Sequence, residues 1–469
     1  MSSPNQTLLR SIPAVEAILG DPRVQKLAES VTRPVVVNAV RSAVDSVRAG
    51  ILSGEWGNDS DQQTLHQAIV DRAVERATFI SRPQYRRAIN ATGVILHTGL
   101  GRAVLACEAL DQIAAELAGY SLLQIDLETG RRGARTARIE RLLNELTGAE
   151  AATVVNNNAA ATSIVLNTVA RGKEVIVSRG QLVEIGGSFR LPEVMEASGV
   201  KLVEVGTTNK THPRDYERAI GENTAALLRV HPSNYKISGF TSEVPLETMV
   251  KIAREHNLVM IDDVGAGSLV DVTRFGFEAE PTLMESVRAG ADLVTSSADK
   301  LIGAAQGGII LGRKPLVDAV RKNPLARIVR LGKLSLAVLE ATLALFLDRD
   351  EAVRRVPTFR MLARPLGDLA EQADRIAAAL GQRGIRAEVA VIDGFSQMGS
   401  GSLPAQNLPT RLVALSPHAG SAGDVARKLR RGTPSVVTRV KANRVLIDPR
   451  TLLEGDEPAL IDALVERCA

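Results

Sequence analysis

The chain has few cysteines, few aromatic residues and no long apolar run. Its 469 residues include two cysteines, Cys107 and Cys468, too few for a disulfide framework or for a site of four thiolates. The most apolar stretch, 334–347, is short and interrupted by Glu340, and the N-terminus lacks a signal-peptide pattern. We therefore expect a cytoplasmic protein with no membrane span and no metal site.

Aromatic residues make up 3% of the chain, with one tryptophan, which leaves little from which to build a stacking platform for nucleic-acid bases. The 57 basic residues exceed the 53 acidic ones by four. This small surplus permits an anionic partner without requiring one. Any contact with RNA is expected to rely on charge and shape.

The length is typical of about three domains of roughly 150 residues each. Apolar residues three or four apart predict a small helical domain over residues 1–75, and Pro83 and Gly93 mark residues 76–93 as a linker. In a large domain over residues 94–345, short β-branched runs alternate with helical patterns, and the runs expected to be strands include GVIL, EVIVS, AALLRVH and LVMIDD. This alternation predicts an α/β fold with a mostly parallel sheet covered by helices on both faces. Residues 346–469 read as a smaller α+β domain.

The first candidate motif, LHTGLGRA, places His97 and Arg102 on a glycine-flanked turn. It resembles the start of a dinucleotide fingerprint, but Val104 stands where the third glycine belongs. The turn suits an anion site, and a plain tight turn explains it equally well.

Three further motifs lie at predicted strand ends. In VVNNNAAAT, residues 154–162, Asn157 and Asn158 open a helix whose backbone amides suit a phosphate, although simple N-capping is an alternative. Asp263 follows a buried strand, where a helix cap is the plainer interpretation, and Lys300 lies in a turn of small residues, where a solvent-facing lysine is common.

The order of these motifs favours pyridoxal phosphate chemistry. A phosphate turn, then Ser233 and Asn234, then Asp263 and Lys300 would meet at the carboxyl ends of one sheet. The lysine amine forms a Schiff base with this cofactor, the carboxylate keeps the pyridine nitrogen protonated, and the helix start holds the phosphate. We therefore predict an aminotransferase-like enzyme, of pyridoxal phosphate fold type I.

Long strings along nearly the whole chain are similar to the bacterial selenocysteine synthase family. They are INATGVILHTGLGRA, VVNNNAAAT, SRGQLVEIGGSFRLPEVM, VGTTNKTH, HPSNYKISGF, DDVGAGSLVD, ADKLIGAAQGG and SQMGSGSLP. The resemblance implies that Lys300 carries pyridoxal phosphate and that Asp263 pairs with its ring nitrogen. It also implies conversion of seryl-tRNA(Sec) to selenocysteinyl-tRNA(Sec) by β-elimination and addition of selenium from selenophosphate.

Further expectations rest on the resemblance alone. It implies that Arg102, Arg327 and Arg330 hold the phosphate of the selenium donor, that the helical N-terminal domain grips the tRNA, and that the protein is a ring-shaped homodecamer with sites between subunits. Small changes beside the site depart from the family strings, at Gly99, Ala298 and 304–305. The roles of Glu184, His212, His231 and the basic segment 131–138 stay open.

Three other functions compete. A related pyridoxal phosphate lyase acting on a small amino acid or amino sugar shares the large domain but does not need the N-terminal one. A tRNA-binding protein without chemistry is less favoured because Lys300 and Asp263 are both present. A dinucleotide oxidoreductase is least favoured because its glycine fingerprint is incomplete.

Overall fold

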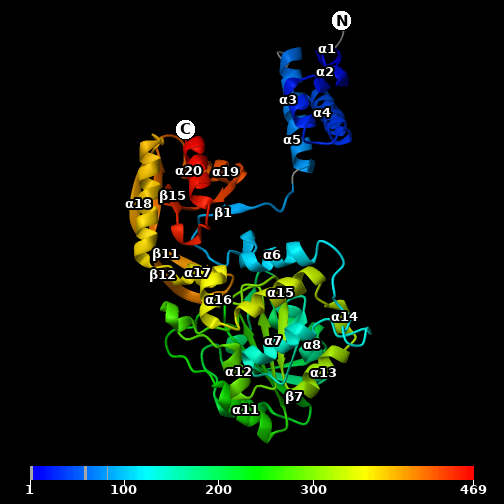
Figure 1. Ribbon diagram of the computed structural model, residues 1–469, viewed down its shortest axis with the longest axis vertical. Coiled ribbons are helices and arrows are strands. Elements are labelled where there is room, and N and C mark those ends of the chain that lie inside the picture. Colours follow the sequence, from blue (N-terminus) through cyan, green and yellow to red (C-terminus); the bar gives the residue numbers. More distant parts are fainter. Residues whose placement is uncertain (1–3, 57–60, 82, 188, 469) are drawn as a thin grey trace. The chain divides into compact units, whose positions relative to one another are not determined.

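The computed structural model describes residues 4–56, 61–81, 83–187 and 189–468. The chain divides into two compact units, Met1–Arg87 and Ala88–Ala469, and Figure 1 shows the elements of each. Each unit has a hydrophobic core of its own.

The first unit consists of helices around an apolar seam. They are α1 (Pro4–Arg10), α2 (Val15–Leu19), α3 (Pro22–Ala28), α4 (Arg33–Ser53) and α5 (Gln62–Ser81). Val40, Val47 and Ile51 follow one another at spacings of seven and four residues on α4 and are buried with Leu65 and Ile69 of α5. Helix α5 continues to Ser81, six residues into the segment expected to be a linker.

A seven-stranded sheet forms the centre of the large domain. Its strands, in spatial order, are β2 (Ala151–Val155), β10 (Gly308–Gly312), β9 (Leu293–Ser297), β8 (Val259–Gly265), β7 (Thr224–Val230), β3 (Glu174–Ser178) and β6 (Lys201–Val205). Strand β10 runs antiparallel to both neighbours, and the other pairs are parallel. The α/β fold class and the mostly parallel sheet are confirmed.

Helices cover both faces of this sheet (Figure 1). One face packs against α8 (Asn158–Ala170), α9 (Leu191–Ala197) and α13 (Lys314–Lys322). The other packs against α7 (Ala137–Thr147), α10 (Pro213–Ala219), α11 (Leu246–Glu255), α12 (Leu283–Ala289) and α15 (Lys333–Leu345). Adjacent residues of β10 show the alternation, since Ile309 and Leu311 belong to one core and Ile310 to the other.

The C-terminal sheet has the order β11 (Ala387–Gly399), β12 (Ser402–Pro417), β15 (Arg444–Ile447) and β14 (Arg439–Lys441). Its core includes residues of α18 (Leu366–Gln382), α19 (Ala422–Arg431) and α20 (Asp456–Arg467). The helices α16 (Arg349–Arg355) and α17 (Pro357–Ala363) instead bury Val353 and Phe359 in the core of the large domain.

The segment that leads into the large domain is fastened to the C-terminal sheet. Strand β1 (Ala88–Asn90) pairs in parallel with β13 (Ser435–Val437), and the amides of Ile95 and Leu96 donate to the carbonyls of Gln397 and Met398 on β11. GVIL, expected to be a strand of the large sheet, therefore lies against the β11–β12 hairpin.

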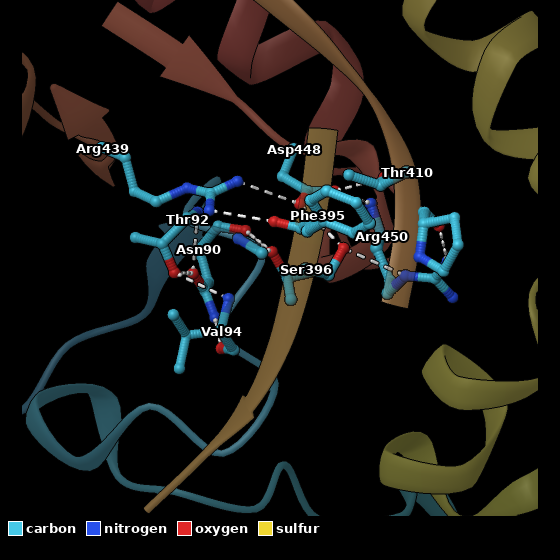
Figure 2. A network of polar contacts seen from close by, with 12 residues as sticks. Asn90, Thr92, Val94, Phe395, Ser396, Thr410, Arg439, Asp448 and Arg450 are labelled. Carbon is cyan, nitrogen blue, oxygen red and sulfur yellow. Dashed lines mark hydrogen bonds and ion pairs between the residues drawn. The ribbon is translucent and has the colours of Figure 1, made fainter. Parts of the chain in front are cut away.

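A buried polar network holds this junction together (Figure 2). Asp448 is fully buried and accepts hydrogen bonds from Ser396 Oγ at 2.8 Å, Thr410 Oγ1 at 2.9 Å and Arg439 Nη2 at 3.3 Å. The backbone of Gly93 comes so close that a Cβ there would lie 1.9 Å from Asp448 Oδ2. Only glycine fits this position, which also has a φ of 72°.

The guanidinium of Arg450 secures the same strand from another direction (Figure 2). It is 3% exposed and donates to Ser396 Oγ at 3.1 Å, Met361 O at 2.9 Å and Pro409 O at 2.7 Å. Burial lowers its pKa, and Asp448 acts in the opposite direction. The part of the β11–β12 hairpin that leads to its tip is thus fixed by charged groups whose hydrogen bonds are made within the protein.

Candidate active site

Lys300 lies in the turn between β9 and β10, at the carboxyl end of β9. It is 6% exposed, and no hydrogen bond within the described residues holds its amine. Burial lowers the pKa of Lys300, and the nearby charge of Arg102 lowers it further, whereas Asp263 and Asp299 act to raise it. A buried lysine of lowered pKa is suited to act as a nucleophile or base.

Asp263 lies near the end of β8 and is 3% exposed. Its carboxylate accepts hydrogen bonds from Asn158 Nδ2 at 2.8 Å, Thr162 Oγ1 at 2.8 Å and the Gly265 amide at 3.1 Å. Burial raises the pKa of Asp263, and these donors act to lower it. The carboxylate is therefore held rigidly, in a position where a cationic partner would favour its charged form.

The turn between β2 and α8 carries the two asparagines. Asn157 Oδ1 accepts from the Ala160 amide at 2.8 Å and so caps α8, while the Asn158 amide group holds Asp263. A Cβ on Gly308 would lie 2.1 Å from Asn157 O, so β10 packs closely against this turn. The side chains of both asparagines therefore serve the turn and Asp263, which leaves backbone amides at the start of α8 as the donors for an anion.

The turn that carries Arg102 contacts Asp299, the residue directly before Lys300, through an ion pair. The amides of Leu100 and Arg102 donate to His97 O, and Arg102 has a φ of 65°. Its Nη1 donates to Asp299 Oδ2 at 2.7 Å. The sequence motif on this turn therefore contributes a guanidinium beside the residue that directly precedes Lys300.

Arg327 and Arg330 lie in and just after α14 (Leu325–Ile328). The Asn156 amide donates to Val329 O at 2.9 Å, which places this segment against the β2–α8 turn. Arg327 and Arg330, together with Arg132, lower the pKa of Arg135, where burial is the larger cause. Arg327 and Arg330 therefore lie on a segment that contacts the turn that opens α8, within electrostatic range of Arg135.

Ser233 and Asn234 follow β7, next to Asp263. Ser233 is 1% exposed and a Cβ on Gly265 would lie 3.4 Å from its Oγ, which has no hydrogen-bond partner among the described residues. Asn234 Nδ2 donates to Glu184 O at 2.8 Å, and its Oδ1 is buried without a partner in the described part of the chain. The unpartnered Ser233 Oγ therefore lies beside Gly265, whose amide donates to Asp263.

The residues whose roles the sequence left open form hydrogen bonds or ion pairs with other residues of the chain. His231 Nε2 lies 2.7 Å from Glu280 Oε2, and Glu184 pairs with Arg190 at 3.2 Å. The His212 amide donates to Asp215 at 2.8 Å, where His212 caps α10. In the basic segment 131–138, Arg135 Nη1 donates to Leu331 O at 3.4 Å.

Sequence reasoning missed two groups at the site. Asp299, the partner of Arg102, stands directly before Lys300, a position that was itself a signal. The tip of the β11–β12 hairpin also reaches the site, where Ser400 Oγ lies 2.9 Å from Thr98 Oγ1. The string SQMGSGSLP, rich in glycine and serine, is part of the family resemblance. No periodicity in the sequence predicts its contact with residues about 300 positions earlier.

Comparison with known proteins decides the family. The family described as L-seryl-tRNA selenium transferase matches residues 88–453. The chain belongs to this family. A second family description, selenocysteine synthase N terminal, matches residues 9–48 of this selenium transferase family member.

Individual relatives agree over nearly the full length. The L-seryl-tRNA(Sec) selenium transferase of Geobacter sulfurreducens is 47% identical over 462 residues, 98% of this chain and 99% of the relative. That of Alkaliphilus metalliredigens is 45% identical over 457 residues, 97% and 98% of the two chains. The resemblance expected from the motifs is thus confirmed.

Among solved structures, D-glucosaminate-6-phosphate ammonia-lyase shares the fold of this selenium transferase family member, with a TM-score of 0.57 and 22% identity. The match covers 82% of this chain and 96% of the lyase. Within the described ranges, no helix is long and apolar enough to cross a membrane. In the same part of the chain, no cluster of histidine, cysteine and acidic side chains has the makings of a metal site.

Proposed function

We propose that this protein converts L-seryl-tRNA(Sec) to L-selenocysteinyl-tRNA(Sec), with selenophosphate as the selenium donor and pyridoxal phosphate as the cofactor. The observation that carries the proposal is that a buried Lys300 lies within electrostatic range of a buried, triply hydrogen-bonded Asp263, in a chain of the selenium transferase family. Its relatives at 45–47% identity bear that enzyme name over nearly their whole length.

The residues present fit pyridoxal phosphate. Lys300 supplies the amine for its aldehyde, Asp263 the carboxylate for its ring nitrogen, and the start of α8 at Asn157 and Asn158 the amides for its phosphate. Ser233 Oγ and Asn158 Oδ1 are buried without hydrogen-bond partners among the described residues, so polar atoms of a ligand could satisfy them. When bound, the cofactor supplies an electron sink for charge that develops on the α-carbon of the substrate.

The protein's own groups divide the remaining work. Asn158 and Thr162 orient the carboxylate of Asp263, so that its charge is fixed toward the cofactor site. Lys300 Nζ, with its lowered pKa, is the base that we expect to accept the α-proton and to return it to the leaving hydroxyl. Burial of Lys300 excludes water from this proton transfer.

We assign Arg102, Arg327 and Arg330 to the phosphate of selenophosphate. Planar guanidinium groups bind the oxygens of such an anion in pairs. The contact between Val329 and Asn156 supports the assignment, because it brings Arg327 and Arg330 to the cofactor's phosphate turn. The ion pair with Asp299 orients Arg102 beside Lys300.

The domains have separate tasks in this proposal. The helical domain of residues 1–75 binds the tRNA, 94–345 hold the cofactor and 346–469 complete the site, in a cytoplasmic homodecamer with sites between subunits. The family description selenocysteine synthase N terminal matches residues 9–48 of this helical domain. Exposed Tyr120, Leu122 and Leu127 on one loop of the large domain are suited to subunit contacts.

The test is conversion of labelled seryl-tRNA(Sec) by the cofactor-loaded protein, with and without selenophosphate. We expect selenocysteinyl-tRNA only when selenophosphate is present, and none from Lys300→Ala. No turnover by a protein that retains the cofactor's absorbance would contradict the proposal and favour a lyase for a small amino acid or amino sugar.

A further inference from the structure

The tip of the β11–β12 hairpin, residues 399–403, lies between two segments of the site. A Cβ on Gly399 would lie 2.5 Å from Val94 Cγ1, and a Cβ on Gly401 would lie 2.7 Å from Asn234 Cβ. Both glycines therefore allow backbone to approach where no side chain fits. The hairpin tip touches the segment that leads to Arg102 on one side and the loop after β7 on the other.

The hairpin tip is held in place by the part of β11 that leads into it. Ser396, four residues before Ser400, is fixed by Asp448 and Arg450, and Arg439 Nη1 donates to Phe395 O at 3.0 Å (Figure 2). Side chains at the tip are thus positioned by a rigid strand, as a binding site requires.

The hairpin tip carries hydroxyl groups whose hydrogen-bonding capacity is unused. Ser402 is 3% exposed, and its Oγ is buried with no partner in the described residues. Ser400 Oγ and Thr98 Oγ1 share one hydrogen bond of 2.9 Å, so the accepting hydroxyl keeps a hydrogen to donate elsewhere. Asn234 Oδ1, beside Gly401, is likewise buried without a described partner. A buried polar group without a partner is unfavourable unless a ligand satisfies it.

These groups are all uncharged. The guanidinium on the same turn as Thr98 belongs to Arg102 and forms an ion pair with Asp299 at 2.7 Å. Residues 399–403 themselves carry no charged side chain, so a free carboxylate bound to the hydroxyl groups of the hairpin tip would lose water without gaining a cation from the tip. An ester, which is neutral and accepts hydrogen bonds, would gain the donors that the tip offers.

We propose that Ser402 and the Ser400–Thr98 pair bind the ester group of the aminoacyl-tRNA and so select esterified serine over free serine. This inference rests on the proposed function and identifies the part of the site that recognises the substrate's ester. It makes the C-terminal sheet a contributor to substrate choice.

The probes are L-serine methyl ester and free L-serine, titrated into the full-length, cofactor-loaded protein while the cofactor's absorbance is followed. We expect the ester to bind at lower concentration than free serine. Ser402→Ala should weaken binding of the ester about tenfold, the effect of one hydrogen bond to a buried acceptor, and leave binding of free serine unchanged. Ser402→Thr, which keeps the hydroxyl, should restore the preference.

A second variant tests the same claim without risk to the fold. Ser400 has a φ of 50°, so Ser400→Gly removes the hydroxyl and relieves a strained backbone at once. It should weaken binding of the ester as Thr98→Val does, and the double variant should be no worse than either single one. Ser416→Ala, at the far end of β12, is the matched control and should change nothing.

The outcomes separate this inference from the proposed function. Equal affinity of the parent protein for ester and free serine overturns the inference even if seryl-tRNA(Sec) is converted. So does an unchanged preference in Ser402→Ala and Ser400→Gly. Loss of the preference in these variants supports the inference even if tRNA turnover fails, because the methyl ester contains no tRNA.

Discussion

At the scale of single residues, the two adjacent aspartates of β8 have different partners and therefore different expected roles. Asp263, at the proposed cofactor site, accepts hydrogen bonds from three donors, whereas Asp262, fully buried, pairs with Arg229 at 3.2 Å. Successive side chains of a strand point to opposite faces, so the two carboxylates have different surroundings. Composition alone does not distinguish the two aspartates, and the family string, in which Asp263 stands directly before V-G-A-G, is what favours Asp263.

We predict that Asp263→Asn lowers kcat at least about 100-fold, because the amide cannot supply the fixed negative charge. Cofactor content, measured by absorbance, should stay close to that of the parent protein. Asp262→Asn should instead lower the free energy of unfolding by about 1–3 kcal/mol and leave kcat within a factor of about two. Equal losses of kcat in both variants would contradict the assignment.

Lys300 gives a second prediction, for the cofactor-free protein. Its folded pKa is lowered, so the unfolded chain binds more protons between that pKa and the ordinary lysine value of about 10.4. The lysine's cost to stability is therefore present below the folded pKa and is lost as pH rises through this window. Lys300→Met should raise the free energy of unfolding at pH 7 and raise it less at pH 10.

Urea unfolding at the two pH values measures this difference. The exposed Lys333→Met serves as control and should change the free energy of unfolding by less than about 0.5 kcal/mol at pH 7. A stabilisation by Lys300→Met that is as large at pH 10 as at pH 7 would show that packing, and not the buried charge, is responsible.

Arg330 gives a third prediction, for the binding of the selenium donor. Arg330→Ala should raise the KM for selenophosphate by roughly 10- to 100-fold, as expected for a lost hydrogen bond between charged groups, with little change in the KM for seryl-tRNA(Sec). Arg313→Ala, which removes an exposed arginine paired with Asp292, is the control. A rise in the KM for the tRNA alone would move Arg330 from the selenium donor to the nucleic acid.

At the scale of elements, local pattern predicted the large sheet well and the junctions poorly. The runs EVIVS, AALLRVH and LVMIDD are β-branched and bounded by turns, and each forms a strand, because alternation and burial are local properties. GVIL has the same composition but lies against β11, about 300 residues later. No local signal encodes such a partner, and the same holds for the hairpin tip.

The closeness of Gly93 to Asp448 leads to a fourth prediction. Gly93→Ala should lower the free energy of unfolding by about 3 kcal/mol or more, since it adds a steric clash to an unfavourable φ. Gly130→Ala is the matched control, because its φ of 67° is similar but its surroundings are open, and it should cost about 1 kcal/mol. Thermal or urea unfolding measures both, and equal losses would mean that the contact with Asp448 relaxes easily.

At the scale of the whole molecule, the chain consists of two units with different kinds of core. Residues 1–87 carry eleven basic and nine acidic side chains, so RNA binding there depends on their arrangement and not on bulk charge. The sequence predicted a helical N-terminal domain from its spacing, but only the family resemblance suggested a role in tRNA binding.

A fifth prediction follows for a chain of residues 88–469. It should retain the cofactor's absorbance and bind L-serine methyl ester like the parent protein, because the site residues all lie in this unit. Its affinity for tRNA(Sec) should fall at least about tenfold, as measured by filter binding. The Lys300→Ala protein, which keeps both units, is the control for tRNA binding, and unchanged affinity of the shorter chain would place the main tRNA contacts in the second unit.

The contacts between the segment around Gly93 and the C-terminal part of the chain also determine the order in which the two units can fold during synthesis. The Gly93 amide donates to Thr451 Oγ1, 358 residues later, so this bond forms only when almost the entire polypeptide has left the ribosome. Helices α4 and α5 pack within the first 81 residues and can assemble early. A nascent chain truncated before β15 would therefore carry a folded helical unit and an unfinished second unit.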